Sequence, residues 1–201
     1  MLDLPEYART ALLTAKPFLH GNGFMIVKLS DTERLHVWHP SLPSQKVATP
    51  IHDHTFDFRS TVLRGVLAHT AFYAYEHDEH ELRWEAKYGG LYRLHMAVAR
   101  DRDDTVLMPI GDGRKLHWLV PKWTQFIPTG SEYSFDAGIF HTSAMGVPGT
   151  PTVTLLQKIR TGCTPFARVA VPLGQKPDND FNRYDPSYET LLDDVLQEVL
   201  R

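Results

Sequence analysis

The stretch HDHTFDFRSTVLRG, residues 52–65, decides how the chain is interpreted, together with the segment that follows it. Apolar and polar residues alternate through His52–Arg64 and again through Leu67–Glu76, with Gly65 between them. Alternation with a period of two is the pattern of a β-strand that has one buried face. The stretch therefore predicts two long strands joined at Gly65.

The same period of two runs through about 150 residues on both sides of this stretch. Many short strands separated by glycine, proline and aspartate turns are typical of a sandwich or barrel rather than of a βαβ fold. The other predicted strands are Phe24–Leu29, Arg34–Trp38, Glu81–Lys87, Tyr92–Ala99, Val106–Met108, Arg114–Val120, Thr124–Ile127, Tyr133–Ala137, Val153–Ile159 and Ala167–Val171.

Two segments near the ends of the chain predict helices. The first is Glu6–Leu19, where Pro5 suits the start of a helix. The second covers about residues 186–200, where apolar residues recur at the spacing of one helical face. That apolar stripe must cover either the outside of the barrel or a partner chain. Its members are Tyr188, Leu191, Leu192, Val195, Leu196, Val199 and Leu200.

Composition excludes several classes of protein. The chain has 201 residues, 42% of them hydrophobic and 22% charged, which suits one globular domain, residues 1–201, and no disordered tether. The net charge of −3 gives no reason to expect nucleic acid or an anionic membrane as a partner. No secretory signal is visible, so we expect a cytoplasmic protein. Cys163 is the single cysteine, which excludes an intrachain disulfide and a cysteine-based zinc site.

Eleven histidines are the unusual feature of the composition. His52 and His54 are two residues apart on a predicted strand, so both imidazoles project from one face. A third candidate, His141, lies in GSEYSFDAGIFHTSAM, residues 130–145. This segment resembles the second motif of the cupin superfamily, G-x5-P-x-G-x2-H-x3-N, with Asp136 in place of proline and Met145 in place of asparagine.

The first cupin motif, G-x5-H-x-H-x3(or 4)-E-x6-G, is matched by His52, His54 and Gly65. Its leading glycine is missing, and Phe58 or Arg59 stands at the glutamate position. The resemblance implies an RmlC-like jelly roll, an antiparallel double-stranded β-helix with a barrel core at about residues 24–174. It also implies one divalent transition metal held by His52, His54 and His141.

A cupin site of three histidines is similar to that of the thiol dioxygenases, the group that contains cysteine dioxygenase. Fe(II) is then the favoured metal, with zinc, manganese or nickel as alternatives. The resemblance has a limit, because no Ser-x-His-x-Tyr sequence follows His141, and the corresponding strand reads TVTLLQ from Thr152 to Gln157.

Asp57 and Arg59 are the candidate catalytic residues. Asp57 could replace the missing glutamate if a β-bulge turned it inward, and otherwise it would be an acceptor near the ligands or part of a turn. Arg59 could clamp a substrate carboxylate, as could Arg64 and Arg93, although a solvent-facing arginine is the more common case. Four other residues, His69, Tyr73, His95 and His117, could face the cavity, while His77 and His80 suit a solvated hairpin tip or a surface metal site.

The sequence thus favours a metal-binding cupin, in first place an Fe(II)-dependent dioxygenase acting on a small thiol or carboxylate-type substrate. A metal-dependent isomerase or hydrolase is the enzymatic alternative, and a small-ligand-binding cupin without turnover is the other. A homodimer formed through sheet edges is a further possibility.

Overall fold

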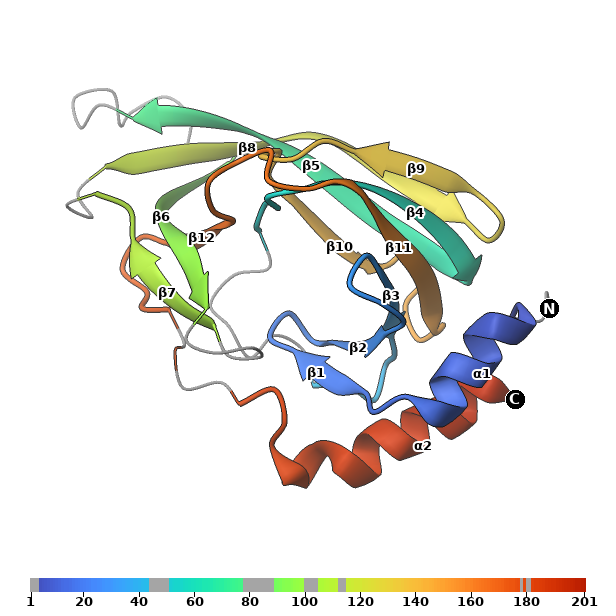
Figure 1. Cartoon of the computed structure of the whole chain (residues 1–201). Helices are drawn as coiled ribbons and strands as arrows, with labels where there is room; N and C mark the ends of the chain where they lie inside the picture. Colours follow the sequence, from blue (N-terminus) through green and yellow to red (C-terminus); the bar gives the residue numbers. More distant parts are fainter. Residues whose placement is uncertain are drawn as a thin grey trace.

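The structure is a computed structural model that describes residues 4–43, 51–77, 89–99, 105–111, 115–177, 179 and 182–201. Two antiparallel six-stranded sheets form its body (Figure 1). The first has the order β1-β2-β3-β11-β4-β9, with bounds Phe18–His20, Phe24–Lys28, Glu33–Trp38, Thr152–Arg160, Asp57–Arg64 and Glu132–Phe135. The second has the order β10-β5-β8-β6-β12, with bounds His141–Met145, Val66–His77, Leu116–Pro128, Gly90–Ala99 and Arg168–Pro172, and β7 (Thr105–Pro109) pairs with β6.

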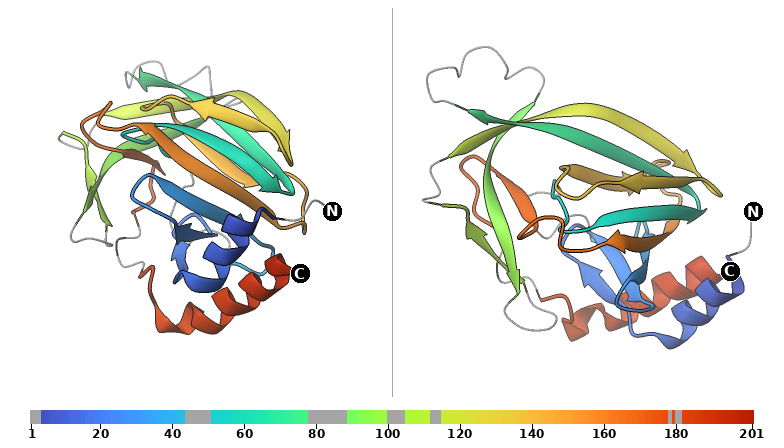
Figure 2. Two further views of the ribbon diagram at one scale, coloured as in Figure 1. Left: turned by 45° about the vertical axis from the view of Figure 1, so that its right-hand side comes forward. Right: turned by 45° about the horizontal axis from the view of Figure 1, so that its top comes forward.

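Both helices cover the outer face of the first sheet. Helices α1 (Glu6–Thr14) and α2 (Glu189–Leu200) lie side by side below β1, β2 and β3 (Figures 1 and 2). A short 3-10 turn, Pro186–Tyr188, leads into α2, and Asp185 caps it by accepting a hydrogen bond from the Ser187 amide. This confirms the predicted amphipathic tail helix and shows that its apolar stripe packs on its own chain. The buried residues in this layer include Ala8, Leu12, Met25, Val27, Leu35, Val37, Val153, Leu155, Leu192, Val195, Leu196 and Val199.

The inner faces of the two sheets pack against each other. Residues from β1 to β5 and β8 form one cluster between them, which includes Phe24, Trp38, Val62 and Leu67. Successive side chains of β3 point to opposite faces of the sheet, as the pleat of a strand requires. Odd-numbered residues of β3 pack against the helices, and even-numbered residues point between the two sheets. The predicted fold class, an antiparallel all-β jelly roll with a helix near each end, is confirmed.

Several predicted boundaries are wrong. The first helix ends at Thr14, not Leu19, because Pro17 cannot continue it, and Phe18–His20 pairs with β2 instead. The strand predicted from His52 begins only at Asp57. The two strands predicted at Arg114–Val120 and Thr124–Ile127 form one strand, β8. Pro121 lies at a register shift in the pairing of β8 with β5, where the amide donor that proline lacks is not required.

Strand β10 was missed, and β9 ends at Phe135 rather than Ala137. The predicted strand Glu81–Lys87 and His80 lie outside the described residues, as does the side chain of His77. Neither α1 nor α2, nor any other helix in the described part of the chain, has the length and apolar character needed to cross a bilayer.

Candidate metal centre

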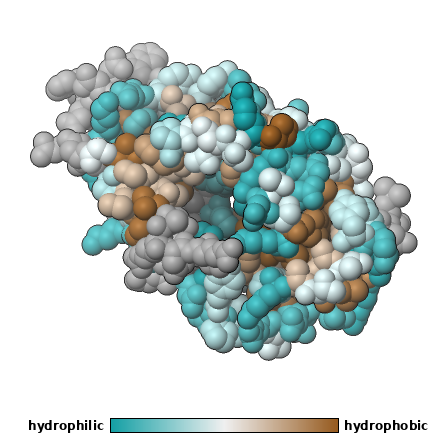
Figure 3. Space-filling model, viewed as in Figure 1, coloured by the Kyte–Doolittle hydropathy of each residue, from teal (hydrophilic) through white to brown (hydrophobic). Residues whose placement is uncertain are grey.

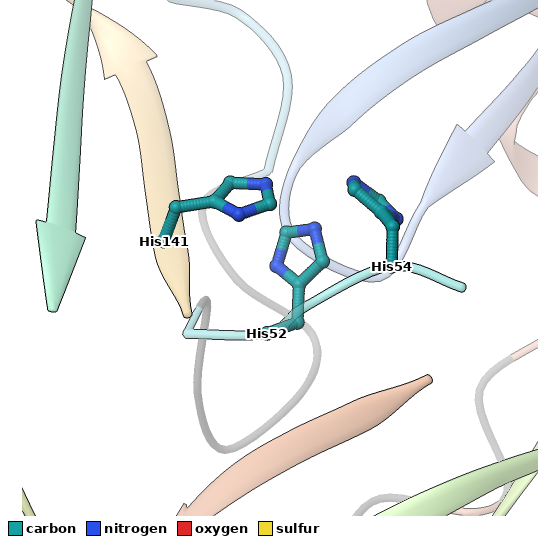
Figure 4. Close-up of side chains that lie close together, drawn as sticks. All are labelled: His52, His54 and His141. Carbon is teal, nitrogen blue, oxygen red and sulfur yellow. The ribbon is translucent and has the colours of Figure 1, made fainter. Parts of the chain in front are cut away.

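The structure brings His52, His54 and His141 together. One ring nitrogen from each lies within 4.8 Å of the others, and the three rings face a common point (Figure 4). His141 begins β10, while His52 and His54 come from the extended segment that precedes β4. This convergence of two distant motifs is what the cupin resemblance implied, and the cluster has the donors to hold a divalent transition metal.

Backbone hydrogen bonds set the distance between the two segments. The His52 amide donates to the His141 carbonyl at 3.1 Å, and the His141 amide donates to the His52 carbonyl at 2.9 Å. His52 also bridges to Val169, so the segment lies between β10 and β12. An antiparallel pair with both hydrogen bonds fixes the two side chains on one face. The ligand geometry is therefore held by main-chain contacts before any metal binds.

Asp53 anchors the same segment from its opposite face. Its side chain is 0% exposed, and its Oδ2 accepts a hydrogen bond from Arg168 Nε at 2.6 Å. Arg168 also donates from Nη2 to the Gly138 carbonyl at 2.9 Å, which ties in the loop before His141. Asp53 therefore points away from the ligands and pairs with a basic side chain. Burial raises the pKa of Asp53, while the hydrogen bonds and charge of Arg168 oppose that rise.

Two histidines of the cluster, His54 and His141, are held neutral. Burial, and then the charges of the neighbouring histidines, lower the pKa of His54 and of His141 well below the ordinary value. His141 Nδ1 lies 3.0 Å from the Ile139 carbonyl, which can only accept, so Nδ1 carries the proton and Nε2 keeps its lone pair. A neutral imidazole with a free Nε2 is the form that binds a metal.

Lowered histidine pKa values predict that the metal-free protein loses stability in mild acid. An unfolded histidine has a pKa near 6.5, whereas burial lowers the pKa of His69 to about 4. Below about pH 6.5 the unfolded chain therefore binds more protons than the folded one. Stability is fully present above that pH and is lost as the pH falls through the folded pKa, by up to about 3 kcal/mol for His69 alone.

Urea unfolding of chelator-treated protein at steps from pH 7.5 to pH 5 measures this loss, in a window where most carboxylates stay ionised. His69→Gln is the matched variant, and it should flatten the dependence. A midpoint that stays constant over this window in the unsubstituted protein would contradict the prediction.

Neither predicted catalytic residue lies with the three histidines. Asp57 Oδ1 accepts a hydrogen bond from the Ala137 amide at 2.8 Å, and Oδ2 pairs with Arg160 Nη2 at 2.7 Å, so its carboxylate serves as a turn acceptor. The register shift near it falls in β11, between Lys158 and Arg160, and does not turn Asp57 inward. Arg59 faces outward by strand alternation, 48% exposed and 3.7 Å from Glu132. The structure thus corrects the placement of both at the site.

The remaining candidates divide between the interior and the surface. Arg64 donates to the Val199 carbonyl in the last turn of α2, and Arg93 is exposed. Tyr73 is exposed and lies below Lys122, while His95 is buried with its Nδ1 near the Arg93 carbonyl. Cys163 is an exposed loop residue. None of these residues joins the cluster.

His69 does face inward, and it belongs to a hydrogen-bonded group that sequence reasoning missed. Its Nδ1 lies 2.8 Å from the Ser143 hydroxyl, and its ring centre lies 5.1 Å from that of His141. Tyr133 hydrogen-bonds both Ser143 and Ser60, and burial raises its pKa to about 12. A serine, a histidine and a tyrosine thus meet beside the cluster from three strands, although no Ser-x-His-x-Tyr sequence is present. The signal that could have found them is strand parity, because Ser143 and His141 share one face of β10.

The molecule is hollowed near the centre of the view of Figure 1 (Figure 3). A cavity of about 630 Å³ lies between β6, β8 and the segment Thr164–Arg168, and His117 and Lys115 are among its lining residues. None of the three clustered histidines is among its lining residues.

Comparisons with known proteins give a likeness of fold. No family model matches the chain, and no curated protein matches it. Hydroquinone 1,2-dioxygenase PnpCD, solved with Cd2+ and 4-hydroxybenzonitrile, is 15% identical with a TM-score of 0.33, over 75% of this chain and 69% of that one. Oxalate decarboxylase of Bacillus subtilis is 12% identical with a TM-score of 0.37, over 77% of this chain and 29% of that one. Vicilin of Corylus avellana is 14% identical with a TM-score of 0.31, over 94% of this chain and 42% of that one. The geometry described above does not depend on these likenesses.

Proposed function

We propose that the chain binds one divalent transition metal through His52, His54 and His141 and, with Fe(II), oxidises a small thiol or carboxylate-type molecule with O2. The observation that carries this proposal is the convergence of three imidazoles without a carboxylate among them. Imidazole suits Fe(II), and three protein ligands leave coordination positions for substrate and for O2. A bound Fe(II) would supply the electrons that activate O2.

The charge of the site favours an anionic substrate. Three neutral imidazoles leave the charge of a divalent ion uncompensated, and Asp57 does not offset it because its carboxylate is paired with Arg160. A thiolate or carboxylate at the metal would reduce that charge. For a thiol, both atoms of one O2 would be added to the sulfur, giving a sulfinic acid, and no outside reductant is needed.

The residues around the cluster have two tasks in this proposal. Phe58 and Phe135 lie against His141 and exclude water from one side of the metal position. His69, Ser143 and Tyr133 form a hydrogen-bonded path beside His141 that can donate hydrogen bonds to a bound substrate. The high pKa of Tyr133 keeps its hydroxyl protonated and able to donate.

Nitric oxide, a surrogate for O2, tests the proposal directly. Protein loaded anaerobically with Fe(II) should bind nitric oxide, detected by electron paramagnetic resonance, and bind it more tightly when a suitable thiol, diketone or small carboxylate is present. Oxygen uptake with the same compounds then measures turnover, and zinc-loaded protein is the control that should consume none.

The outcomes separate the alternatives. If nitric oxide never binds the iron, the metal has no open position, and a binding protein without turnover replaces the dioxygenase. Elemental analysis of protein purified without added metal adds a second criterion, because zinc in place of iron would favour Lewis-acid chemistry, as in a hydrolase or isomerase.

A further inference from the structure

The segment that carries His52 joins the two ends of the second sheet. Strands β10 and β12 stand at the ends of its strand order, and His52 bridges to His141 of β10 and to Val169 of β12. The Asp53 amide continues the second pairing by donating to the Arg168 carbonyl at 2.9 Å. The five strands and this segment therefore form a ring of hydrogen-bonded neighbours.

The cavity of about 630 Å³ is lined by four strands of this ring. Its lining residues include Glu76 of β5, Leu94 of β6, His117 of β8 and Arg168 of β12. Small-molecule sites in proteins typically have volumes of roughly 300–1,000 Å³, so the cavity has the size of a binding site.

Alternate residues of the closing segment face opposite sides. His52 and His54 belong to the cluster of three histidines, whereas Ile51 packs in a buried cluster with Leu94. Asp53 pairs with Arg168, and both Leu94 and Arg168 line the cavity. The cavity therefore lies against the face of this segment that is opposite the two ligand histidines.

One wall of the cavity is apolar. Leu94 and Ile110 belong to the buried cluster that also contains Phe140, and Pro165 and Phe166 line the cavity from the loop before β12. Such a wall favours a ligand with an apolar body, because burying that body removes its surface from water.

Arg168 is the polar anchor of the cavity. Its Nε donates to Asp53 Oδ2 at 2.6 Å, its Nη2 donates to the Gly138 carbonyl at 2.9 Å, and its guanidinium carbon lies 4.7 Å from the ring centre of Phe140. Within the described residues, Nη1 has no acceptor. A guanidinium already held by two partners loses little freedom when it binds a ligand, and its remaining N–H groups can donate to a carboxylate.

The charges of the lining favour an anion over a cation. Two cations, Arg168 and Lys115, and one carboxylate, Glu76, line the cavity. Lys115 and Glu76 pair with each other at 3.3 Å, and both side chains are largely exposed. The Asp53 carboxylate is fully buried and is not among the lining residues, so a ligand in the cavity meets the guanidinium of Arg168 and not its counter-ion.

We propose that this cavity binds a small apolar monocarboxylic acid, with the carboxylate on Arg168 and the apolar body against Leu94, Ile110 and Phe166. This ligand is distinct from the substrate of the proposed dioxygenase, because its site contains none of the three clustered histidines. Binding at this site requires no metal, so the proposal stands or falls independently of the metal centre.

The test measures binding of octanoate to chelator-treated protein by isothermal titration calorimetry. Octanoate should bind at least about tenfold more tightly than acetate, which has the carboxylate but lacks the apolar body. It should also bind at least about fivefold more tightly than octanamide, and octylammonium should bind most weakly. These four compounds test the ligand class in the unsubstituted protein, so this part needs no variant to fold.

Two variants locate the bound octanoate. Ile110→Trp fills part of the cavity and should weaken octanoate binding at least about fivefold, whereas Ile159→Trp, on an exposed position of β11 outside the cavity, is the matched control and should leave it unchanged. Arg168→Lys retains a charge for Asp53 but removes the remaining N–H groups of the guanidinium, so the preference for octanoate over octanamide should fall below about twofold. Melting temperatures without ligand show whether each variant is folded.

Binding at the three histidines is the alternative location for the carboxylate. His141→Ala should bind octanoate as tightly as the parent protein if the cavity is the site, and loss of binding in this variant would place the ligand at the histidines and overturn the proposal. Equal affinities for octanoate and octanamide in the parent protein, or equal affinities for octanoate in folded Ile110→Trp and Ile159→Trp, would also overturn it.

Discussion

Replacing His141 by alanine should reduce metal affinity by at least about a hundredfold while the protein stays folded. His141 is the most deeply buried of the three clustered histidines, and its Nδ1–H is already committed to the Ile139 carbonyl. Two imidazoles from one short segment cannot enclose an ion, so the third supplies the opposite side of the coordination sphere. His52→Ala and His54→Ala should have the same effect for the same reason.

The measurement combines metal content with stability. Metal at a thousand times its dissociation constant stabilises a folded protein by about 4 kcal/mol, so added metal should raise the melting temperature of the parent protein. His141→Ala should show no such rise, and elemental analysis should find it empty. His117→Ala is the matched control, because His117 is half-buried and is not a member of the cluster of three histidines. Full metal content in His141→Ala would refute the assignment of the site.

The positions of the three histidines could be predicted from the sequence, because they depend on strand parity and on the spacing of a motif. His52 and His54 were expected on one face and His141 was found at a motif spacing, and the structure brings all three together. The tail helix was predictable for a similar reason, since seven apolar positions at helical spacing leave few alternatives.

The remainder depends on contacts between strands that are distant in the sequence. Asp57 and Arg59 were chosen because they follow His54 closely, but alternation and the pairing with Arg160 and Glu132 turn them outward. Tyr133 and Ser143 meet His69 only because β5 pairs with β10 and β9 lies opposite.

Replacing Val195 by aspartate should destabilise the protein by about 3 kcal/mol or more. Val195 lies in the middle of α2, fully buried against the layer that contains Leu35, Val37 and Val153. A carboxylate at this position would lose its hydration, and the apolar residues around it offer no compensating partner. A domain of this size is typically stable by only about 5–15 kcal/mol, so the loss would be a large fraction of the total.

Denaturant unfolding of Val195→Asp measures this loss, and Gln197→Asp is the matched control, because Gln197 is exposed on the opposite side of the same helix. Both aspartates have the same helix propensity and lie in the same half of α2, so both experience a similar helix dipole. The difference in unfolding free energy between the two variants therefore reports the cost of burying the carboxylate. Because the stripe of α2 is covered by its own chain, the folded fraction of Val195→Asp should keep the mass of the parent in light scattering. A halved mass with unchanged unfolding would instead show that a second chain covers α2 in solution.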